Sequence, residues 1–374
     1  METLHFLRAP GRVSKSLDIA VIAGDGIGPE VIEAAIPAIE TAAKISGAGI
    51  TWERLPYGAD HYLKTGETLP DSAFQHLQDD VDGILLGAVG DPRVPGNEHA
   101  RDILLGLRFR LDLFVNFRPS VLLHPDLCPL KKADGRMGGW ADGDNIDFVI
   151  FRENTEGPYL ARGSSKFPGT MDEEQISEDV NTAKKVERII RAAFEWATKN
   201  GKTLVTMADK SNAIPAHRLW QRLFKSVGEQ FPSIQREHRY VDALAMELVQ
   251  RPERFQVIVT TNLFGDILSD LGAGLVGGLG VAASANLHPG RTGLFEPVHG
   301  SAPAQAGKNT ANPMAAVLTG ALMLADLGLG DAAKALESAV QAALREGVRT
   351  ADVGGTSGTA EVGKWIAAHV GGQG

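Results

Sequence analysis

Cysteine is almost absent from this sequence of 374 residues, and Cys128 is the only one. A single cysteine cannot form a disulfide within the chain, so a secreted disulfide scaffold is excluded and stability must come from packing. A reducing compartment fits this composition, and we expect a cytoplasmic protein. Positive charge is also in deficit, with 37 Lys and Arg against 46 Asp and Glu and a net charge of -9. Such a surface repels polyanions, so we expect no nucleic-acid partner.

Long apolar runs are missing as well. The longest, at residues 313–325, falls well short of the roughly 20 residues that a membrane-spanning helix needs, so we expect no membrane association. Residues 1–17 carry Arg8, Arg12 and Lys15 but no apolar segment followed by a cleavage site, and we interpret them as an N-terminal tail. Hydrophobic residues make up 43% of the chain, enough for the core of two domains or of one large α/β unit.

Short β-branched runs alternate with long helical patterns from residue 17 onward. Strands are predicted at residues 18–23, 49–55, 82–86, 146–151, 203–208 and 257–260. Helices are predicted at residues 28–45, 177–200, 216–231, 263–272, 313–327 and 332–345, with a closing helix from Thr359. This alternation is typical of an α/β fold with an open sheet flanked by helices. Residues 131–145 are predicted to be an exposed loop, and residues 272–280, with five glycines, a flexible or tightly packed crossing and a candidate boundary.

The first glycines of the chain lie where many α/β proteins place a phosphate-binding loop, between a strand and a helix. Residues 24–28 read Gly-Asp-Gly-Ile-Gly. A dinucleotide fingerprint requires a third glycine three positions after the second, but position 29 is Pro29. Proline suits the first turn of a helix, and Glu30 is favourable near the positive end of the helix dipole. The residues therefore favour a structural turn over a cofactor-binding loop.

Two carboxylates stand out in the segment Asn-Leu-Phe-Gly-Asp-Ile-Leu-Ser-Asp at residues 262–270. Asp266 and Asp270 are four positions apart, so both project from one face of the helix predicted after the strand at 257–260. Their mutual repulsion is relieved either by exposure to solvent or by a divalent cation. Oxygen ligands alone favour Mg²⁺ or Mn²⁺. For this pair alone a solvated acidic face is the simpler explanation, and a metal site is the alternative.

Several other side chains have the chemistry of a site for acids. Arg108, Arg118 and Arg152 each lie beside a strand-like or turn-like segment, and three guanidinium groups that converged would hold a dicarboxylate. Lys210 follows an apolar strand, where it could serve as a base. Tyr159 lies in a turn and could deliver a proton. Taken singly, each of these residues also fits an ordinary surface or structural role.

Together these segments resemble the isocitrate and isopropylmalate dehydrogenase family, whose members oxidise and decarboxylate 2-hydroxy acids. The resemblance runs from about Leu17 to the C-terminal helix and includes five ordered motifs, at residues 24–30, 152–157, 240–242, 262–270 and 296–303. It implies an isopropylmalate dehydrogenase-like fold with a large open sheet and two subdomains. Residues 18–113 and 277–374 would form the cofactor-binding subdomain, and residues 114–276 the subdomain for dimerisation and metal binding.

The resemblance also implies roles for the candidate residues. Asp266 and Asp270 would bind Mg²⁺ or Mn²⁺ together with Asp242 of a second subunit, so that the active site requires a homodimer. The three arginines would hold the carboxylates of the substrate. Lys210, also from the partner subunit, would assist removal of the hydroxyl proton, and Tyr159 would protonate the enol that remains after loss of CO₂.

The family binds its dinucleotide along the loop at residues 296–306. The residues expected to contact the cofactor are Glu296, His299, Gly300, Ser301, Ala302, Ala304, Gln305 and Asn312. NAD users of the family carry Asp-Ile after the Ser-Ala-Pro segment at 301–303, and NADP users carry Lys-Tyr, whereas this chain has Ala304 and Gln305. No cation is present there for a 2′-phosphate, so we expect NAD.

The substrate is indicated by residues just before Arg108. Leu104 and Leu105 are similar to the leucines that face the isopropyl branch in isopropylmalate enzymes, which favours oxidative decarboxylation of 3-isopropylmalate to 4-methyl-2-oxopentanoate in leucine biosynthesis. Arg101 departs from this pattern, because those enzymes usually carry glutamate there. A decarboxylating dehydrogenase of the tartrate or D-malate type is the alternative. A noncatalytic regulatory subunit is a further alternative, although it would be expected to have lost a metal aspartate, the lysine or the tyrosine.

Overall fold

The fold is given by a computed structural model that describes residues 16–130 and 145–372. Its centre is a mixed sheet of ten strands, as the sequence predicted for an open sheet flanked by helices. In sheet order the strands are β2 (Gly49–Leu55), β1 (Ser16–Gly24), β3 (Gly83–Ala88), β12 (Gly293–Pro297), β11 (Ala283–Leu287), β4 (Val115–Val121), β5 (Asp147–Glu153), β10 (Val257–Thr260), β8 (Leu204–Asp209) and β9 (Gln235–Tyr240).

The sheet consists of two parallel wings joined by an antiparallel centre. Strands β2, β1, β3 and β12 are parallel, as are β5, β10, β8 and β9, whereas β11 and β4 pair antiparallel with their neighbours. The first five strands in this order, from β2 to β11, come from residues 18–113 and 277–374, except that β1 begins at residue 16. The other five, from β4 to β9, come from residues 114–276. The division into two subdomains along these boundaries stays a prediction.

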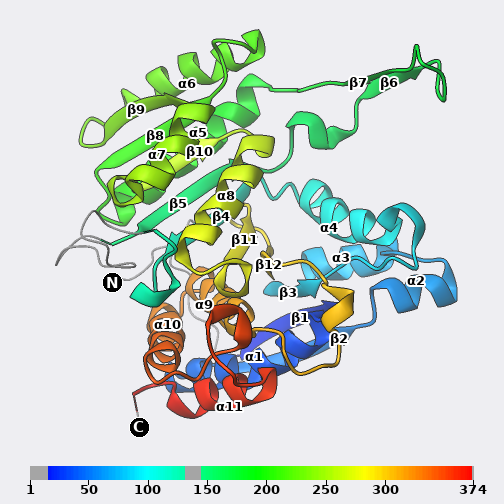
Figure 1. Cartoon of the computed structure of the whole chain (residues 1–374), viewed down its shortest axis with the longest axis vertical. Helices are drawn as coiled ribbons and strands as arrows, with labels where there is room; N and C mark the ends of the chain where they lie inside the picture. The colour runs from blue at the N-terminus through cyan, green and yellow to red at the C-terminus, as the bar shows by residue number, and fades with distance from the viewer. Residues whose placement is uncertain (1–15, 131–144, 373–374) are drawn as a thin grey trace.

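Helices cover the sheet on both sides (Figure 1). They are α1 (Gly28–Ile45), α2 (Ala59–Thr65), α3 (Asp71–Asp79), α4 (Glu98–Arg110), α5 (Ala183–Lys199), α6 (Arg218–Gly228), α7 (Val241–Gln250), α8 (Asn262–Val276), α9 (Met314–Asp326), α10 (Gly330–Arg345) and α11 (Thr359–His369). Helix α9 is apolar on all sides because it packs between α1, α10 and strands β11 and β12. Within the described residues, no helix combines the length and the apolar character needed to cross a membrane.

A two-stranded hairpin projects from this body. Strands β6 (Gly163–Lys166) and β7 (Glu174–Ser177) pair antiparallel with each other, and Figure 1 shows them as an arm that extends away from the ten-stranded sheet. The sequence predicted a helix from residue 177, which is wrong for its first turns, because α5 begins only at Ala183. All four residues of β7 are exposed, so the amphipathic pattern that identifies a helix begins only after the arm.

The glycine-rich segment after residue 272 also differs from its prediction. Helix α8 continues through Gly272 to Val276 instead of ending at the first glycine. A Cβ atom at Gly272 would lie 2.5 Å from Ser120 Oγ, so the glycine lets the helix approach β4 closely. Of the predicted tail, β1 includes residues 16 and 17, whereas residues 1–15 and most of the predicted loop, residues 131–144, lie outside the described residues.

Candidate active site

The early Gly-Asp-Gly-Ile-Gly segment packs against the loop that follows β12. Gly26 has a φ of +59°, and a Cβ atom there would lie 1.9 Å from the carbonyl oxygen of Ser301. The same oxygen accepts a hydrogen bond of 2.8 Å from the Ile27 amide. Asp25 is buried and accepts bonds from the Ala59 amide and from His99. These contacts agree with a structural turn at residues 24–28.

Helix α8 begins directly after β10 and carries the two predicted metal ligands. Asp266 and Asp270 lie one turn apart, and each retains partial exposure. Burial opposes ionisation of Asp266, but the charge of Arg152 and a hydrogen bond from Tyr159 keep its pKa below the ordinary value. Burial raises the pKa of Asp270, against the charge of Arg118, whose Nη1 lies 3.9 Å from its Oδ1. A divalent cation would stabilise the ionised form of both carboxylates, so the pair fits a metal.

The three predicted arginines converge on this end of α8 although α4, β4 and β5 carry them. Arg108, Arg118 and Arg152 are exposed by only 5%, 6% and 1%, respectively. Burial lowers the pKa of Arg152 to about 10, and the charges of the other two arginines act in the same direction. Arg152 binds the carboxylate of Asp266. Three buried cations of this kind need anionic partners.

One arginine has an unused donor. Arg108 Nη2 donates to Glu296 Oε1 at 2.6 Å, and this charge outweighs the effect of burial and holds the pKa of Glu296 below its ordinary value. The buried Nε of Arg108 has no hydrogen-bond partner among the described residues. A buried donor without a partner is costly, so this nitrogen indicates where an anionic ligand would bind.

Buried amides orient the arginines, and the sequence reasoning did not identify them. Asn262 Oδ1 accepts from Arg152 Nε at 2.8 Å, and Asn116 Oδ1 accepts from Arg118 Nε at 2.8 Å. Asn286 connects Asn116 to Glu296 through bonds of 2.8 and 2.9 Å. For Asn116 and Asn286 the available signal was an asparagine inside a predominantly buried strand, because a buried amide requires partners, whereas Asn262 is the first residue of α8.

Tyr159 lies in the short turn Gly157–Leu160 after β5 and donates its hydroxyl proton to Asp266. Burial, together with this hydrogen bond, raises the pKa of the phenol. The tyrosine is therefore protonated at neutral pH and lies beside the predicted metal ligand. This is the form and the place that a proton donor requires.

Lys210 and Asp242 form a separate pair in the same chain. Lys210 Nζ lies 2.6 Å from Asp242 Oδ1, and this bond lowers the pKa of the carboxylate. Lys210 follows β8, and Asp242 lies in the first turn of α7. In the part of the chain that the structure describes, three or more acidic, histidine or cysteine side chains do not gather into a metal-binding group. The geometry of one chain thus keeps Asp242 apart from Asp266 and Asp270.

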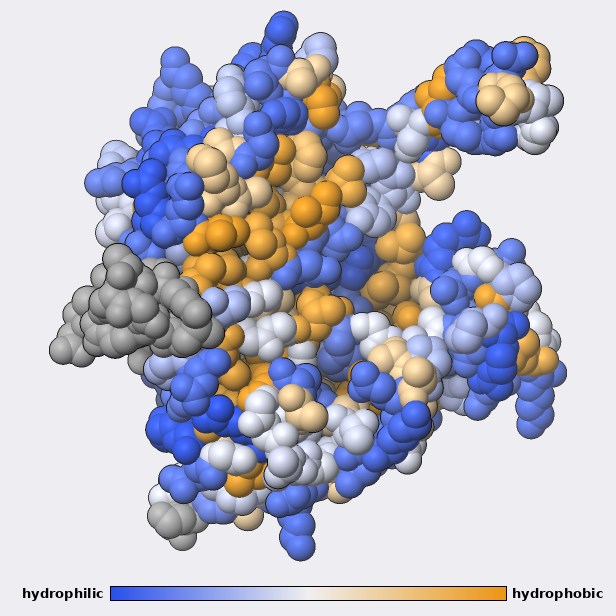
Figure 2. All heavy atoms as spheres, viewed as in Figure 1, coloured by the Kyte–Doolittle hydropathy of each residue, from blue (hydrophilic) through white to orange (hydrophobic). Residues whose placement is uncertain are grey.

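The predicted substrate pocket lies on α4. Leu104 and Leu105 are half-buried and precede Arg108 by four and three positions, so they flank it on one helix face. Arg101 lies one turn earlier on that face and is largely exposed. In Figure 2 the surface is hollowed between α4 and the part of the molecule that carries α8.

The predicted cofactor loop follows β12. Glu296 is buried at its start, and its carboxylate binds Arg108 and Asn286. His299 Nε2 is buried without a hydrogen-bond partner among residues 16–130 and 145–372, and burial lowers the pKa of the ring. Asn312 is buried and donates to Asp352 at 3.0 Å. A free buried ring nitrogen fits a loop that contacts a polar cofactor. The remaining predicted contacts, Gly300, Ser301, Ala302, Ala304 and Gln305, follow along the same loop, and Ala304 and Gln305 are exposed.

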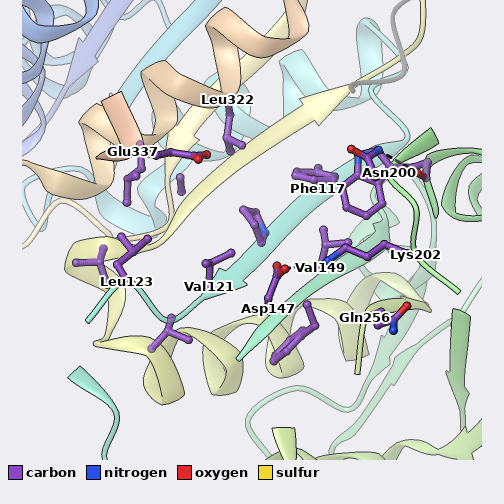
Figure 3. Close-up of a pocket in the computed structure, with 17 residues that line it drawn as sticks. Phe117, Val121, Leu123, Asp147, Val149, Asn200, Lys202, Gln256, Leu322 and Glu337 are labelled. Carbon is purple, nitrogen blue, oxygen red and sulfur yellow. Dashed lines mark hydrogen bonds and ion pairs between the residues drawn. The ribbon is translucent and has the colours of Figure 1, made fainter. Parts of the chain in front are cut away.

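A cavity of about 230 Å³ lies elsewhere and contains none of the predicted site residues. It has 17 lining residues, and Figure 3 shows Leu322 and Glu337 across it from the strand residues Val121 and Val149. Phe117 also lines it, and because successive side chains of a strand point to opposite faces, Arg118 lies on the other side of β4. Burial raises the pKa of Glu337 to about 7. This lining does not suit a dicarboxylate substrate.

Comparison with known proteins agrees with the motifs. Residues 18–366 match the family model described as isocitrate/isopropylmalate dehydrogenase. The chain is 43% identical over 368 residues to the 3-isopropylmalate dehydrogenase of Beutenbergia cavernae, covering 96% of this chain and 100% of that protein. It is 43% identical over 345 residues to the 3-isopropylmalate dehydrogenase of Mycobacterium marinum, covering 90% of this chain and 98% of the relative.

A solved structure gives the same result for the fold. The isocitrate dehydrogenase of Methylococcus capsulatus superposes with a TM-score of 0.82 at 36% identity, covering 95% of this chain and 99% of that one. The resemblance inferred from the motifs is therefore confirmed over nearly the whole chain: it belongs to the isocitrate/isopropylmalate dehydrogenase family.

Proposed function

We propose that this chain is a 3-isopropylmalate dehydrogenase of leucine biosynthesis, which oxidises and decarboxylates its substrate to 4-methyl-2-oxopentanoate. The observation that carries the proposal is the convergence of three buried arginines beside two helical carboxylates. Arg118 and Arg152 would bind the carboxylates of the substrate, and the free Nε of Arg108 supplies a further donor. Leu104 and Leu105 would cover the isopropyl group.

The residues fit a divalent cation and a nicotinamide cofactor. Asp266 and Asp270, with Asp242 of a second copy, would hold Mg²⁺ or Mn²⁺, and the loop with His299 and Asn312 would hold NAD. When bound, the cation would supply polarisation of the 2-hydroxyl oxygen, and the nicotinamide would supply an acceptor for the hydride of C2. Neutral Ala304 and Gln305 offer no cation for a 2′-phosphate, which supports NAD over NADP.

Two side chains would move protons. Lys210 Nζ, as a neutral amine, would take the proton of the substrate hydroxyl and become an ammonium, and Asp242, which accepts a hydrogen bond of 2.6 Å from it, holds the side chain near the site of transfer. Tyr159 is protonated at neutral pH because burial raises its pKa, so its hydroxyl would give a proton to the carbon that has lost CO₂. Because Lys210 and Tyr159 are both present, a noncatalytic subunit is not favoured.

The active site would be shared between two copies of the chain. Asp242 and Lys210 pair with each other away from Asp266 and Asp270, so each pair would complete the other across a dimer interface. The outer faces of α7 and α8 expose apolar side chains, and Figure 2 shows them as a continuous hydrophobic area. These side chains are Met246, Val249, Leu263 and Ile267. An apolar surface of this kind marks an interface, which supports a homodimer.

Steady-state kinetics test the proposal. The purified protein is assayed with 3-isopropylmalate, D-malate, tartrate, isocitrate and homoisocitrate, each with NAD and NADP in the presence of Mn²⁺. The highest kcat/KM is expected for 3-isopropylmalate with NAD. A higher kcat/KM for D-malate or tartrate would establish the alternative, a decarboxylating dehydrogenase of the tartrate or D-malate type. Arg101, which departs from the isopropylmalate pattern, would agree with that result. No turnover of any substrate would favour the noncatalytic alternative.

A further inference from the structure

The main chain of Lys210 is fixed on both sides, although its side chain is long and flexible. Its carbonyl oxygen accepts hydrogen bonds from the Ala213 and Ile214 amides at 2.9 and 2.8 Å. Its own amide donates to Nδ1 of His217 at 3.1 Å. The first two bonds are local to the turn, whereas the third joins the turn to a side chain from the short helix Pro215–His217. Loss of this bond would leave a partly buried donor unpaired.

His217 is buried, with only 1% of its side chain exposed, and both ring nitrogens have partners. Nδ1 accepts from the Lys210 amide, so we assign the proton of the neutral ring to Nε2. Nε2 lies 2.8 Å from Asp179 Oδ2 and donates to it. The carboxylate thus selects the tautomer that leaves Nδ1 free to accept, in the way that a hydrogen-bonded carboxylate orients a histidine at many functional sites.

A further layer holds the carboxylate of Asp179. Its Oδ1 accepts from Asn181 Nδ2 at 3.1 Å, and Asn181 Oδ1 accepts from Trp220 Nε1 at 2.8 Å. Trp220 is fully buried in α6. The chain of bonds from Trp220 to the Lys210 amide therefore begins in a rigid part of the core and ends at the residue that would move the hydroxyl proton.

We propose that His217 is a positioning residue for Lys210, held by Asp179 so that its Nδ1 fixes the main chain from which the catalytic amine extends. The inference rests on the proposed function only in giving Lys210 the role of proton acceptor. His217 touches neither substrate nor cofactor and acts through Lys210. A displacement of about 1 Å at a reacting group can cost as much as 100-fold in rate, so the anchor matters for turnover.

The same segment reaches the turn that carries Tyr159. The carbonyl of Val180, next to Asp179, accepts from the Gly157 amide at 2.9 Å. In addition, the ring of Phe264, from the first turn of α8, packs edge-on against the ring of His217, and the two ring centroids are 5.5 Å apart. His217 thus lies where the lysine turn, the tyrosine turn and the metal-ligand helix meet. If Lys210 serves the second copy, the network also joins the two active sites of the dimer.

Two substitutions separate the two hydrogen bonds of His217. His217→Asn retains an acceptor near the position of Nδ1, and His217→Gln retains a donor near the position of Nε2. We expect kcat for 3-isopropylmalate to stay within about threefold of the wild type in the asparagine variant and to fall about 10- to 100-fold in the glutamine variant. The KM values for 3-isopropylmalate and for NAD should change little, because the arginine cluster and the cofactor loop are not altered.

His217→Leu and Asp179→Ala should both lower kcat, and their effects should not add, because they remove one chain of bonds. His124→Leu is the matched control. His124 Nδ1 also accepts a main-chain bond, from the Asp126 amide at 3.3 Å, but in a different part of the molecule. It should leave kcat unchanged. Thermal unfolding of every variant shows that the comparison is made between folded proteins.

A second measurement does not depend on turnover. Limited acetylation with acetic anhydride, followed by peptide mass spectrometry, gives the labelling rate of Lys210 relative to the surface residue Lys199. We expect faster labelling of Lys210 in His217→Leu and His217→Gln and a wild-type rate in His217→Asn. Equal kcat and equal labelling in the asparagine and glutamine variants would overturn the proposal. A silent wild-type enzyme with the expected labelling pattern would instead contradict the proposed function and leave the anchor supported.

Discussion

Glu296 and Arg108 form a buried ion pair at the base of the arginine cluster, with side-chain exposures of 9% and 6%. The charge of Arg108 lowers the pKa of Glu296 relative to 4.5, in spite of burial. A carboxyl whose pKa is lower in the folded state stabilises the fold above its unfolded pKa, and this contribution is lost as pH falls through the folded value.

We therefore expect Glu296→Gln to lower the free energy of unfolding at neutral pH by about 3 to 5 kcal/mol, the usual cost of breaking a buried pair. The difference in unfolding free energy between the variant and the wild type should shrink as pH falls from about 5 through the lowered pKa of Glu296. Thermal unfolding at several pH values in this range measures this difference. Glu33→Gln, which breaks the exposed pair with Arg54, is the control and should show little difference at any pH. A difference for Glu296→Gln that does not vary with pH would contradict this account.

Leu104 gives a prediction about selectivity. It is half-buried one turn before Arg108, where the branched end of a substrate held by the arginines would lie. Leu104→Ser should reduce kcat/KM for 3-isopropylmalate relative to D-malate by roughly 10- to 100-fold, corresponding to about 1 to 3 kcal/mol of apolar contact. Leu63→Ser, on the exposed face of α2, is the control. An unchanged ratio between the two substrates would remove Leu104 from the pocket.

At the scale of elements, α8 depends on glycines to carry its carboxylates. A Cβ atom at Gly265 would lie 2.5 Å from Cβ and Cγ of Arg152, which is buried and cannot move aside. Gly265→Ala should destabilise the protein by about 1 to 3 kcal/mol through overpacking. It should also weaken Mn²⁺ binding, because Asp266 is the next residue.

Gly106→Ala provides the control, in helix α4. A Cβ atom at Gly106 would meet nothing within 4 Å, so alanine should be neutral or stabilising by up to about 1 kcal/mol. Denaturant unfolding and a Mn²⁺ titration compare the two variants. Equal effects of the two substitutions would show that close packing on β5 does not explain the glycine at position 265.

The sequence predicted local elements well where their pattern is self-contained. Helix α1 and strands β2 and β10 occupy the predicted residues, because their apolar periodicity does not depend on distant contacts. The extent of α8 was missed because its glycines are explained by Ser120 and Arg152, which come from other strands. The charged site residues could be found because they lie in short motifs that are local in the sequence. The supporting role of Asn116 and Asn286 depends on contacts between distant residues, so only the structure shows it.

At the scale of the whole molecule, strand order brings the arginines together. Arg118 in β4 and Arg152 in β5 are on neighbouring antiparallel strands, and α4 places Arg108 beside them. This order is non-local, so periodicity alone cannot give it, and the expectation that the arginines converge came from chemistry and from the family resemblance. Strand order also places Lys210 and Asp242, which follow β8 and β9, as a pair on a different part of the same chain.

That separation yields a test with mixed dimers. Lys210→Ala removes the proposed proton acceptor, and Asp266→Asn removes a proposed metal ligand that also binds Arg152 and Tyr159. Each homodimer should be nearly inactive. If each site combines Asp266 and Asp270 of one copy with Asp242 and Lys210 of the other, a heterodimer of the two variants has one site with both wild-type groups. The second site of that heterodimer carries both substitutions.

The heterodimer, isolated with two affinity tags, should therefore recover about half of the wild-type kcat, since one of its two sites is intact. The two homodimers carried through the same purification are the controls. Recovery is not expected if each chain completes its own site, because every site in the mixture would then contain one substitution. Activity no higher than that of the homodimers would place Lys210 and Asp266 in the same site of a single chain and rule out a shared active site.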